Sequence, residues 1–221
     1  MTILDLLLPA RCVVCCASVG KQLCDGCRES LPLLRLPLCE RCGAPTAWPV
    51  SRCRECSGRR LAFASARAAV EYDESVRRFV SAWKERGLRR LAAEAAALVV
   101  QAIPPPRVAL VGFVPPDRER VLLRGHHPAE RLARELGERW ELPVRSLLAW
   151  KRTIPHQRGL KLSERRRNVA GAFRPAAETP SRVALVDDVY TSGATAAAAA
   201  SALRKAGARR VEVVTFARVV R

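Results

Sequence analysis

Two adjacent carboxylates, Asp187 and Asp188, stand between a run of apolar residues and a run of small, hydroxyl-bearing residues. A carboxylate does not bind a phosphate group, because like charges repel. It does accept hydrogen bonds well from the hydroxyl groups of a ribose diol. The acid pair therefore indicates contact with a sugar, although two acids that simply cap the following helix are the plainer alternative.

The residues that follow the acid pair suit a phosphate group. A tight loop that opens a helix directs several backbone N–H groups at one point, and the helix dipole adds to the positive field there. Phosphate at the loop and a diol at the acids together describe a ribose 5-phosphate. The loop consists of Thr191, Ser192, Gly193, Ala194 and Thr195.

Eight of the nine cysteines form a second group with recognisable chemistry. They fall into four Cys-x-x-Cys pairs, and two such pairs complete the tetrahedron of sulfur ligands that is typical of structural zinc. Neighbouring pairs could share one ion, giving two zinc ions, but pairing of first with third and second with fourth stays open. Redox dithiols or an iron–sulfur cluster are the other readings. The eight are Cys12, Cys15, Cys24, Cys27, Cys39, Cys42, Cys53 and Cys56, and Cys16 has no partner in this pattern.

The cysteine-rich region, residues 1–60, contains few large apolar side chains, so zinc would contribute most of its stability. No apolar run is long enough to span a membrane, and the opening residues, which include Asp5, lack the features of a secretory signal. We therefore predict a cytoplasmic protein. In that compartment cysteines stay reduced and bind metal rather than form disulfides.

The chain carries a strong positive charge. Its 39 Lys and Arg residues outnumber 21 Asp and Glu residues, giving a formal net charge of +18, which favours an anionic partner such as nucleic acid. A general enrichment in arginine is the alternative explanation. Basic residues gather in segments 117–124 and 151–174, where they suit either pyrophosphate or a nucleic-acid backbone. The candidates are Arg118, Arg120, Arg124, Lys151, Arg158, Lys161, Arg165 and Arg166.

The elements that must position these residues alternate between strands and helices. Residues 183–186 predict a buried strand that ends at the acid pair, and the alanine-rich run to Lys205 predicts a helix that Gly207 ends. Other strands are expected at 64–71, 107–114 and 211–217, with a short one at 144–148. Other helices are expected at 74–85, 88–103 and 128–140, the last of which His126 and His127 would start.

This alternation predicts an α/β fold, with a parallel sheet that carries helices on both faces, over residues 61–221. Residues 1–60 would form a separate, small zinc-ribbon module. Loops at the carboxyl ends of parallel strands converge on one crevice. We therefore expect the arginine-rich loop after strand 107–114 to lie near the acid pair.

The stretch from residue 183 to 195 closely resembles the signature of type I phosphoribosyltransferases: an apolar run, Asp-Asp, Val, any residue, Thr, Thr or Ser, Gly, Ala, Thr. That resemblance implies a type I phosphoribosyltransferase-like sheet. It also implies that the acids hold the ribose hydroxyls of phosphoribosyl pyrophosphate (PRPP), bound together with Mg2+, and that the loop holds its 5-phosphate.

Nearly the whole chain is similar to the ComF/GntX family of competence proteins. The similarity rests on the cysteine pairs, on Val114-Pro115 and Arg124-Gly125, on the segment before the signature, which includes Asn168-Val169, and on the signature itself. It implies a role in natural transformation, in which the protein handles incoming single-stranded DNA in the cytoplasm. The family usually has Asn-Gln after Arg-Gly, where this chain has His126-His127.

We therefore expect a protein that binds single-stranded DNA and carries a PRPP-type site, with binding rather than catalysis as its mechanism. An active phosphoribosyltransferase is the second reading, but neither its acceptor nor its catalytic base can be read from the sequence. The third is a zinc-ribbon module that recruits a DNA helicase or recombination protein and retains only a degenerate ligand site.

Overall fold

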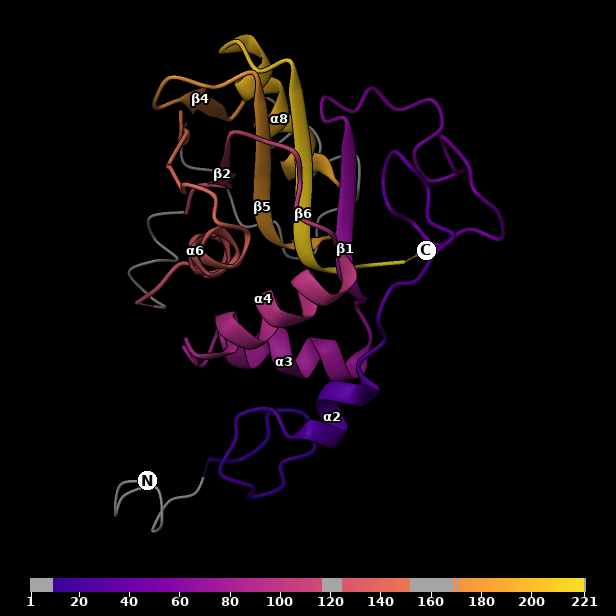
Figure 1. Ribbon diagram of the computed structural model, residues 1–221, viewed down its shortest axis with the longest axis vertical. Helices are drawn as coiled ribbons and strands as arrows, with labels where there is room; N and C mark the ends of the chain where they lie inside the picture. Colours follow the sequence, from indigo (N-terminus) through magenta and orange to yellow (C-terminus); the bar gives the residue numbers. More distant parts are fainter. Residues whose placement is uncertain (1–9, 117–124, 152–168, 170, 221) are drawn as a thin grey trace.

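The computed structural model describes residues 10–116, 125–151, 169 and 171–220, and it contains a parallel sheet of four strands (Figure 1). The strands lie side by side in the order β1-β6-β5-β2. Because all four run in the same direction, their carboxyl ends meet at one edge of the sheet. They are β1 (Ser65–Glu71), β2 (Leu110–Phe113), β5 (Arg182–Tyr190) and β6 (Arg210–Arg218).

Helices cover both faces of this sheet, as predicted. Ala184 and Val186 of β5 belong to one buried cluster, whereas Val183 and Leu185 belong to another, because alternate residues of a strand point to opposite faces. Within the described ranges, no helix is both long enough and apolar enough to cross a bilayer. The first face is covered by α3 (Glu74–Lys84), α4 (Leu91–Ala102) and α6 (Pro128–Trp140), and the second by α8 (Ala194–Lys205).

Packing of α3 against the sheet matters for the site. Asp73 caps the helix by accepting a hydrogen bond from a backbone N–H of the first turn at 2.8 Å. Phe79 and Trp83 then pack on Phe216 of β6, with ring centroids 4.8 and 6.2 Å away. These contacts fix the last turn of α3, which ends in Lys84.

A separate antiparallel pair consists of β3 (Leu148–Trp150) and β4 (Phe173–Pro175). Trp150 packs on Phe173 with ring centroids 4.2 Å apart, and its Nε1 donates a hydrogen bond to the Pro115 carbonyl at 3.0 Å. The short strand expected at 144–148 is thus misplaced. It begins only at the last of those residues, because residues 143–145 make a single isolated bridge to β2.

The cysteine-rich region divides between the two faces of the sheet. We call residues 11–28 the first ribbon; it includes most of α2 (Asp25–Ser30) and joins the core beneath α3 and α4. Residues 38–59, the second ribbon, join the core beside β1 and α8. Figure 1 shows the first ribbon beyond α2 and the second beside β1, well apart from each other. A domain boundary at residue 60 stays a prediction.

Candidate functional site

The acid pair lies within β5 rather than after it. β5 continues to Tyr190 because its backbone stays paired with β6, where Asp187 is opposite Thr215 and Tyr190 is opposite Arg218. The expectation that the strand ends at the acids is therefore wrong. Pairing with β6 both before and after the acids along the strand holds their backbone in place. The carboxylates therefore project from a rigid element.

The two carboxylates have different electrostatic environments. Burial raises the pKa of Asp187 to about 7, and the negative charge of Asp188 adds to that shift. The Asp188 N–H donates a hydrogen bond to Asp187 Oδ1 at 2.9 Å. Asp188 itself forms an ion pair with Lys84, whose Nζ lies 2.6 Å from Oδ1. Near neutral pH, Asp187 is thus partly protonated and the charge of Asp188 is balanced by Lys84.

Lys84 is a site residue that the sequence analysis missed. It is the last residue of α3, far along the chain from its partner Asp188. Nothing in its local sequence distinguishes it from other exposed lysines, because the contact depends on how α3 packs across the sheet. Its side chain is mostly buried, with 21% exposed.

His127 begins α6, as the sequence predicted. Its Nδ1 accepts a hydrogen bond from the Glu130 N–H at 3.2 Å, which caps the helix. Burial lowers the pKa of His127 to about 4, although the charge of Asp188 opposes that shift. The imidazole is therefore neutral at physiological pH and adds no positive charge for a phosphate.

The predicted phosphate loop forms a sharp turn into α8. Gly193 caps the helix with φ 70° and ψ 9°, a left-handed conformation that favours glycine. A Cβ at this position would lie 2.2 Å from the Tyr190 hydroxyl oxygen, so any side chain would collide. Ser192 Oγ accepts a hydrogen bond from the Ala194 N–H at 3.3 Å and closes the turn.

Asp187 and the phosphate loop line one small hollow at the carboxyl end of β5. Asp187 lines it on one side, together with Thr215 of β6. The first N–H of α8, that of Ala194, is taken by Ser192 Oγ, but the N–H groups of the next two residues have no partner within the helix and are available to an anion. Asp188 is turned toward Lys84 instead, and Ser192 is buried in the turn. The loop residues that line the hollow are Thr191, Gly193, Ala194 and Thr195.

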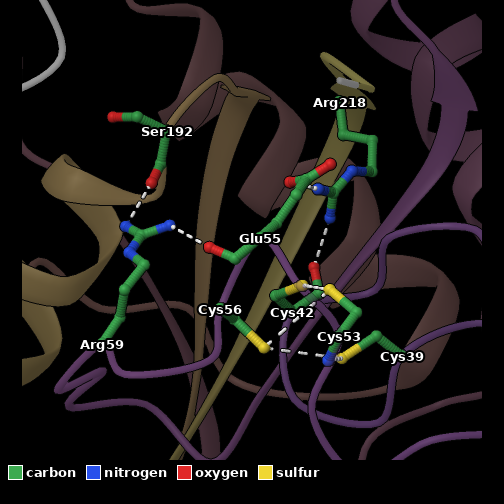
Figure 2. A network of polar contacts seen from close by, with 8 residues as sticks. All are labelled: Cys39, Cys42, Cys53, Glu55, Cys56, Arg59, Ser192 and Arg218. Carbon is green, nitrogen blue, oxygen red and sulfur yellow. Dashed lines mark hydrogen bonds and ion pairs between the residues drawn. The ribbon is translucent and has the colours of Figure 1, made fainter.

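The second ribbon reaches this loop through the Arg59 side chain (Figure 2). Arg59 donates a hydrogen bond to the Ser192 carbonyl at 2.5 Å. Arg218 of β6 forms an ion pair with Glu55, 2.8 Å away, and donates to the Cys42 carbonyl. The sequence does not reveal the roles of Arg59, Glu55 and Arg218, because nothing local marks a contact between segments so far apart.

The cysteines form two groups of four, each made from neighbouring pairs. The sulfur atoms of each group lie within 4.8 Å of one another, and Sγ distances such as 3.7 Å between Cys39 and Cys56 match a tetrahedron with Zn–S bonds of about 2.3 Å. All nine cysteines are free thiols, and Cys16 belongs to neither group. The donor sets therefore fit two structural zinc ions, and the neighbouring arrangement is the one the fold adopts.

One thiol in each group of four cysteines has a lowered pKa, which favours metal binding. Burial alone would raise the pKa of Cys12, but backbone N–H donors outweigh burial and lower the pKa to about 6. The same balance lowers the pKa of Cys39 to about 7. Because the thiolate is the form that binds zinc, these donors favour ligation at neutral pH.

Most of the basic candidates lie outside the described residues. Lys151 is exposed and directly follows β3. The two basic segments, 117–124 and 151–174, begin shortly after Pro115 and Trp150, and a hydrogen bond joins these two residues. Outside the described residues lie Arg118, Arg120, Arg124, Arg158, Lys161, Arg165 and Arg166.

Comparison with known proteins gives two consistent results. Residues 3–57 match the family model of the double zinc ribbon domain. Competence protein F of Haemophilus influenzae is 31% identical, over 94% of this chain and 96% of that protein. The chain belongs to the competence protein F family. The predicted family resemblance is thereby confirmed, and the double zinc ribbon contains all eight predicted cysteine ligands.

Two further proteins are similar to this competence protein F family member. DNA utilization protein YhgH of Salmonella typhimurium is 27% identical, over 97% of this chain and 100% of that protein. The crystal structure of TT1426 from Thermus thermophilus has a TM-score of 0.36 and 21% identity, over 58% of this chain and 83% of that one. The second likeness is too weak to support any conclusion.

Proposed function

We propose that this competence protein F family member acts in natural transformation, where it handles incoming single-stranded DNA in the cytoplasm and binds PRPP or a related ribose 5-phosphate. Support for the first part comes from the relatives, which carry the names competence protein F and DNA utilization protein and align over nearly their whole length. Support for the second part comes from the hollow at the carboxyl end of β5.

The hollow is the observation that carries the sugar-phosphate proposal. An acid that can accept hydrogen bonds from ribose hydroxyls, Asp187, lies across from a turn that opens a helix of 12 residues. The phosphate would accept hydrogen bonds from the free N–H groups in the first turn of α8 and from the Thr191 and Thr195 hydroxyls. The hydroxyls of one ribose 5-phosphate would thus meet a hydrogen-bond acceptor, and its phosphate would meet hydrogen-bond donors.

Mg2+ would arrive with the ligand rather than be held by the protein. Among the described residues, the acid pair gathers no third metal-ligating side chain. Mg2+ is commonly bound by one or two carboxylates together with the phosphates of a substrate. The diphosphate of PRPP would supply the oxygen ligands that this site lacks.

The DNA-binding part of the proposal rests on charge. A net charge of +18 and the exposed Lys151 at the start of the most basic segment suit a phosphate backbone without sequence preference. We expect the affinity for a single-stranded oligonucleotide to fall steeply with salt, by about a thousandfold or more between 50 and 200 mM if six or more phosphates are neutralised. Salt-insensitive or absent binding would contradict this part.

Isothermal titration calorimetry with PRPP and Mg2+ tests the site. The wild type should bind, and a variant with both Asp187→Asn and Asp188→Asn should lose measurable binding while keeping its affinity for the oligonucleotide. Equal PRPP affinities for the two proteins would refute the assignment of the site. A PRPP-binding wild type can then be assayed for pyrophosphate release with a panel of bases and amines, which separates a binding protein from an active transferase.

A further inference from the structure

We propose that the second zinc ribbon positions the phosphate loop, and that Arg59 is the positioning residue through which it acts. This inference rests on the proposed ribose 5-phosphate site and assigns it a supporting element from a distant part of the chain. The two cysteine clusters would then differ in role, although their sequences suggest two equivalent zinc ribbons.

The first contact between the second ribbon and the phosphate loop is a direct hydrogen bond from Arg59. Arg59 stands three residues after Cys56, a ligand of the second cluster. One guanidinium nitrogen donates to the Ser192 carbonyl at 2.5 Å, and another donates to the Glu55 carbonyl at 3.4 Å (Figure 2). Arg59 therefore bridges the ribbon backbone and the loop backbone, at the residue that immediately precedes Gly193.

The second contact runs through the end of β6. The Arg218 side chain is 99% buried, its guanidinium pairs with Glu55 at 2.8 Å, and it donates to the Cys42 carbonyl. The same guanidinium lies 5.0 Å from the centre of the Tyr190 ring. Tyr190 in turn packs directly beneath Gly193. A buried cation and an aromatic ring thus connect the ribbon to the same loop at a second residue, Gly193.

These contacts depend on the zinc cluster being closed. Glu55 lies between Cys53 and Cys56, and the Cys42 carbonyl belongs to another ligand, so both partners of Arg218 are held by the metal site. Without zinc the turn would lose its anchor, and a buried arginine would lose its compensating charge. The loop would then lose both contacts at once.

The first ribbon has a different neighbourhood. Arg78 of α3 donates to the Val14 carbonyl, and Arg28 forms an ion pair with Glu94 of α4. These contacts attach it to α3 and α4, and in Figure 1 the first ribbon lies beyond α2, with these helices between it and the sheet. The first ribbon thus reaches the site only through α3, whereas the second ribbon contacts the phosphate loop itself, so the second ribbon should have the larger influence on the affinity for a phosphate ligand.

Calorimetry with ribose 5-phosphate tests the role of Arg59. Arg59→Met keeps most of the aliphatic stem but removes the hydrogen-bond donors, and it should weaken ribose 5-phosphate binding about tenfold. Arg59→Lys restores a donor and should recover much of that loss. Arg60→Met is the matched control, since the neighbouring Arg60 directly follows the same ribbon and is exposed, and it should bind like the wild type.

The zinc content, the melting temperature and the oligonucleotide affinity of Arg59→Met should stay at the wild-type values. If the wild type binds ribose 5-phosphate and Arg59→Met binds it equally well, the positioning role is wrong while the proposed site stands. If Arg59→Met loses zinc or folds poorly, Arg59 acts on the ribbon itself, and the inference is also overturned. If the wild type binds no ribose 5-phosphate, the proposed site fails and the inference fails with it.

Discussion

Asp187 is the residue whose protonation should control the affinity of the site. Burial, reinforced by the charge of Asp188, raises its pKa to about 7. A protonated carboxyl group offers fewer acceptor positions to ribose hydroxyls than a carboxylate does. The ligand should therefore bind best when Asp187 is ionised, which is the form that burial disfavours.

We expect the affinity for ribose 5-phosphate to rise by about tenfold between pH 6 and pH 8, because the ionised fraction of a group with a pKa of about 7 rises by that factor. Calorimetry across this pH range measures the change. The phosphate group of the ligand also ionises near pH 6, so Asp187→Asn serves as the control. A wild-type pH profile that parallels that of Asp187→Asn would contradict the role given to Asp187.

The same shift predicts how stability changes with pH. The folded protein holds a proton on Asp187 that the unfolded chain has already released, so this stabilisation is complete at low pH and is lost as pH rises through about 7. Relative to Asp187→Asn, which carries no charge, the wild type should lose about 1 kcal/mol between pH 6 and pH 8. Denaturant unfolding of both proteins at the two pH values measures the difference, and a constant difference would count against the raised pKa.

At the level of elements, local sequence patterns predicted the helices well. The spacing of Phe79 and Trp83 located α3, and α6 begins and ends where the sequence indicated. The end of β5 could not be placed, because polar side chains at Asp187 and Asp188 conceal a backbone that remains paired with β6. The contacts of Lys84 were likewise beyond prediction, since they follow from the packing of whole elements.

The phosphate loop should tolerate no side chain at Gly193. Gly193→Ala would place a Cβ against the Tyr190 hydroxyl in addition to straining a positive φ, so it should destabilise the fold by about 2 kcal/mol or more and abolish ribose 5-phosphate binding. Gly171→Ala is the control, because Gly171 has a similar φ of 66° but no atom of the described residues within 4 Å of its Cβ position. Similar melting temperatures for the two variants would show that the close contact with Tyr190 is unimportant.

At the scale of the whole molecule, the two ribbons join the hydrophobic cores on opposite faces of one α/β sheet. The sequence predicted the eight ligands, because a Cys-x-x-Cys pair has a local geometry of its own. It left their pairing open and could not show that the clusters lie far apart, since that depends on where Cys12 and Cys39 enter the two cores. Opposite positions allow the clusters to support different elements.

Loss of one zinc ion should therefore have a different effect in each ribbon. Native mass spectrometry should find two zinc ions in the wild type and one in either Cys12→Ser or Cys56→Ser. Ribose 5-phosphate affinity should fall about tenfold or more in Cys56→Ser and stay close to that of the wild type in Cys12→Ser. Equal losses in the two variants would mean that zinc acts on global stability alone.

The most direct test of the proposed site is a crystal structure of the protein soaked with ribose 5-phosphate. We predict that the sugar hydroxyls lie against the Asp187 carboxylate and that the phosphate lies over the free N–H groups in the first turn of α8, between Thr191 and Thr195. An empty hollow, with the ligand bound elsewhere or absent, would contradict the proposed site.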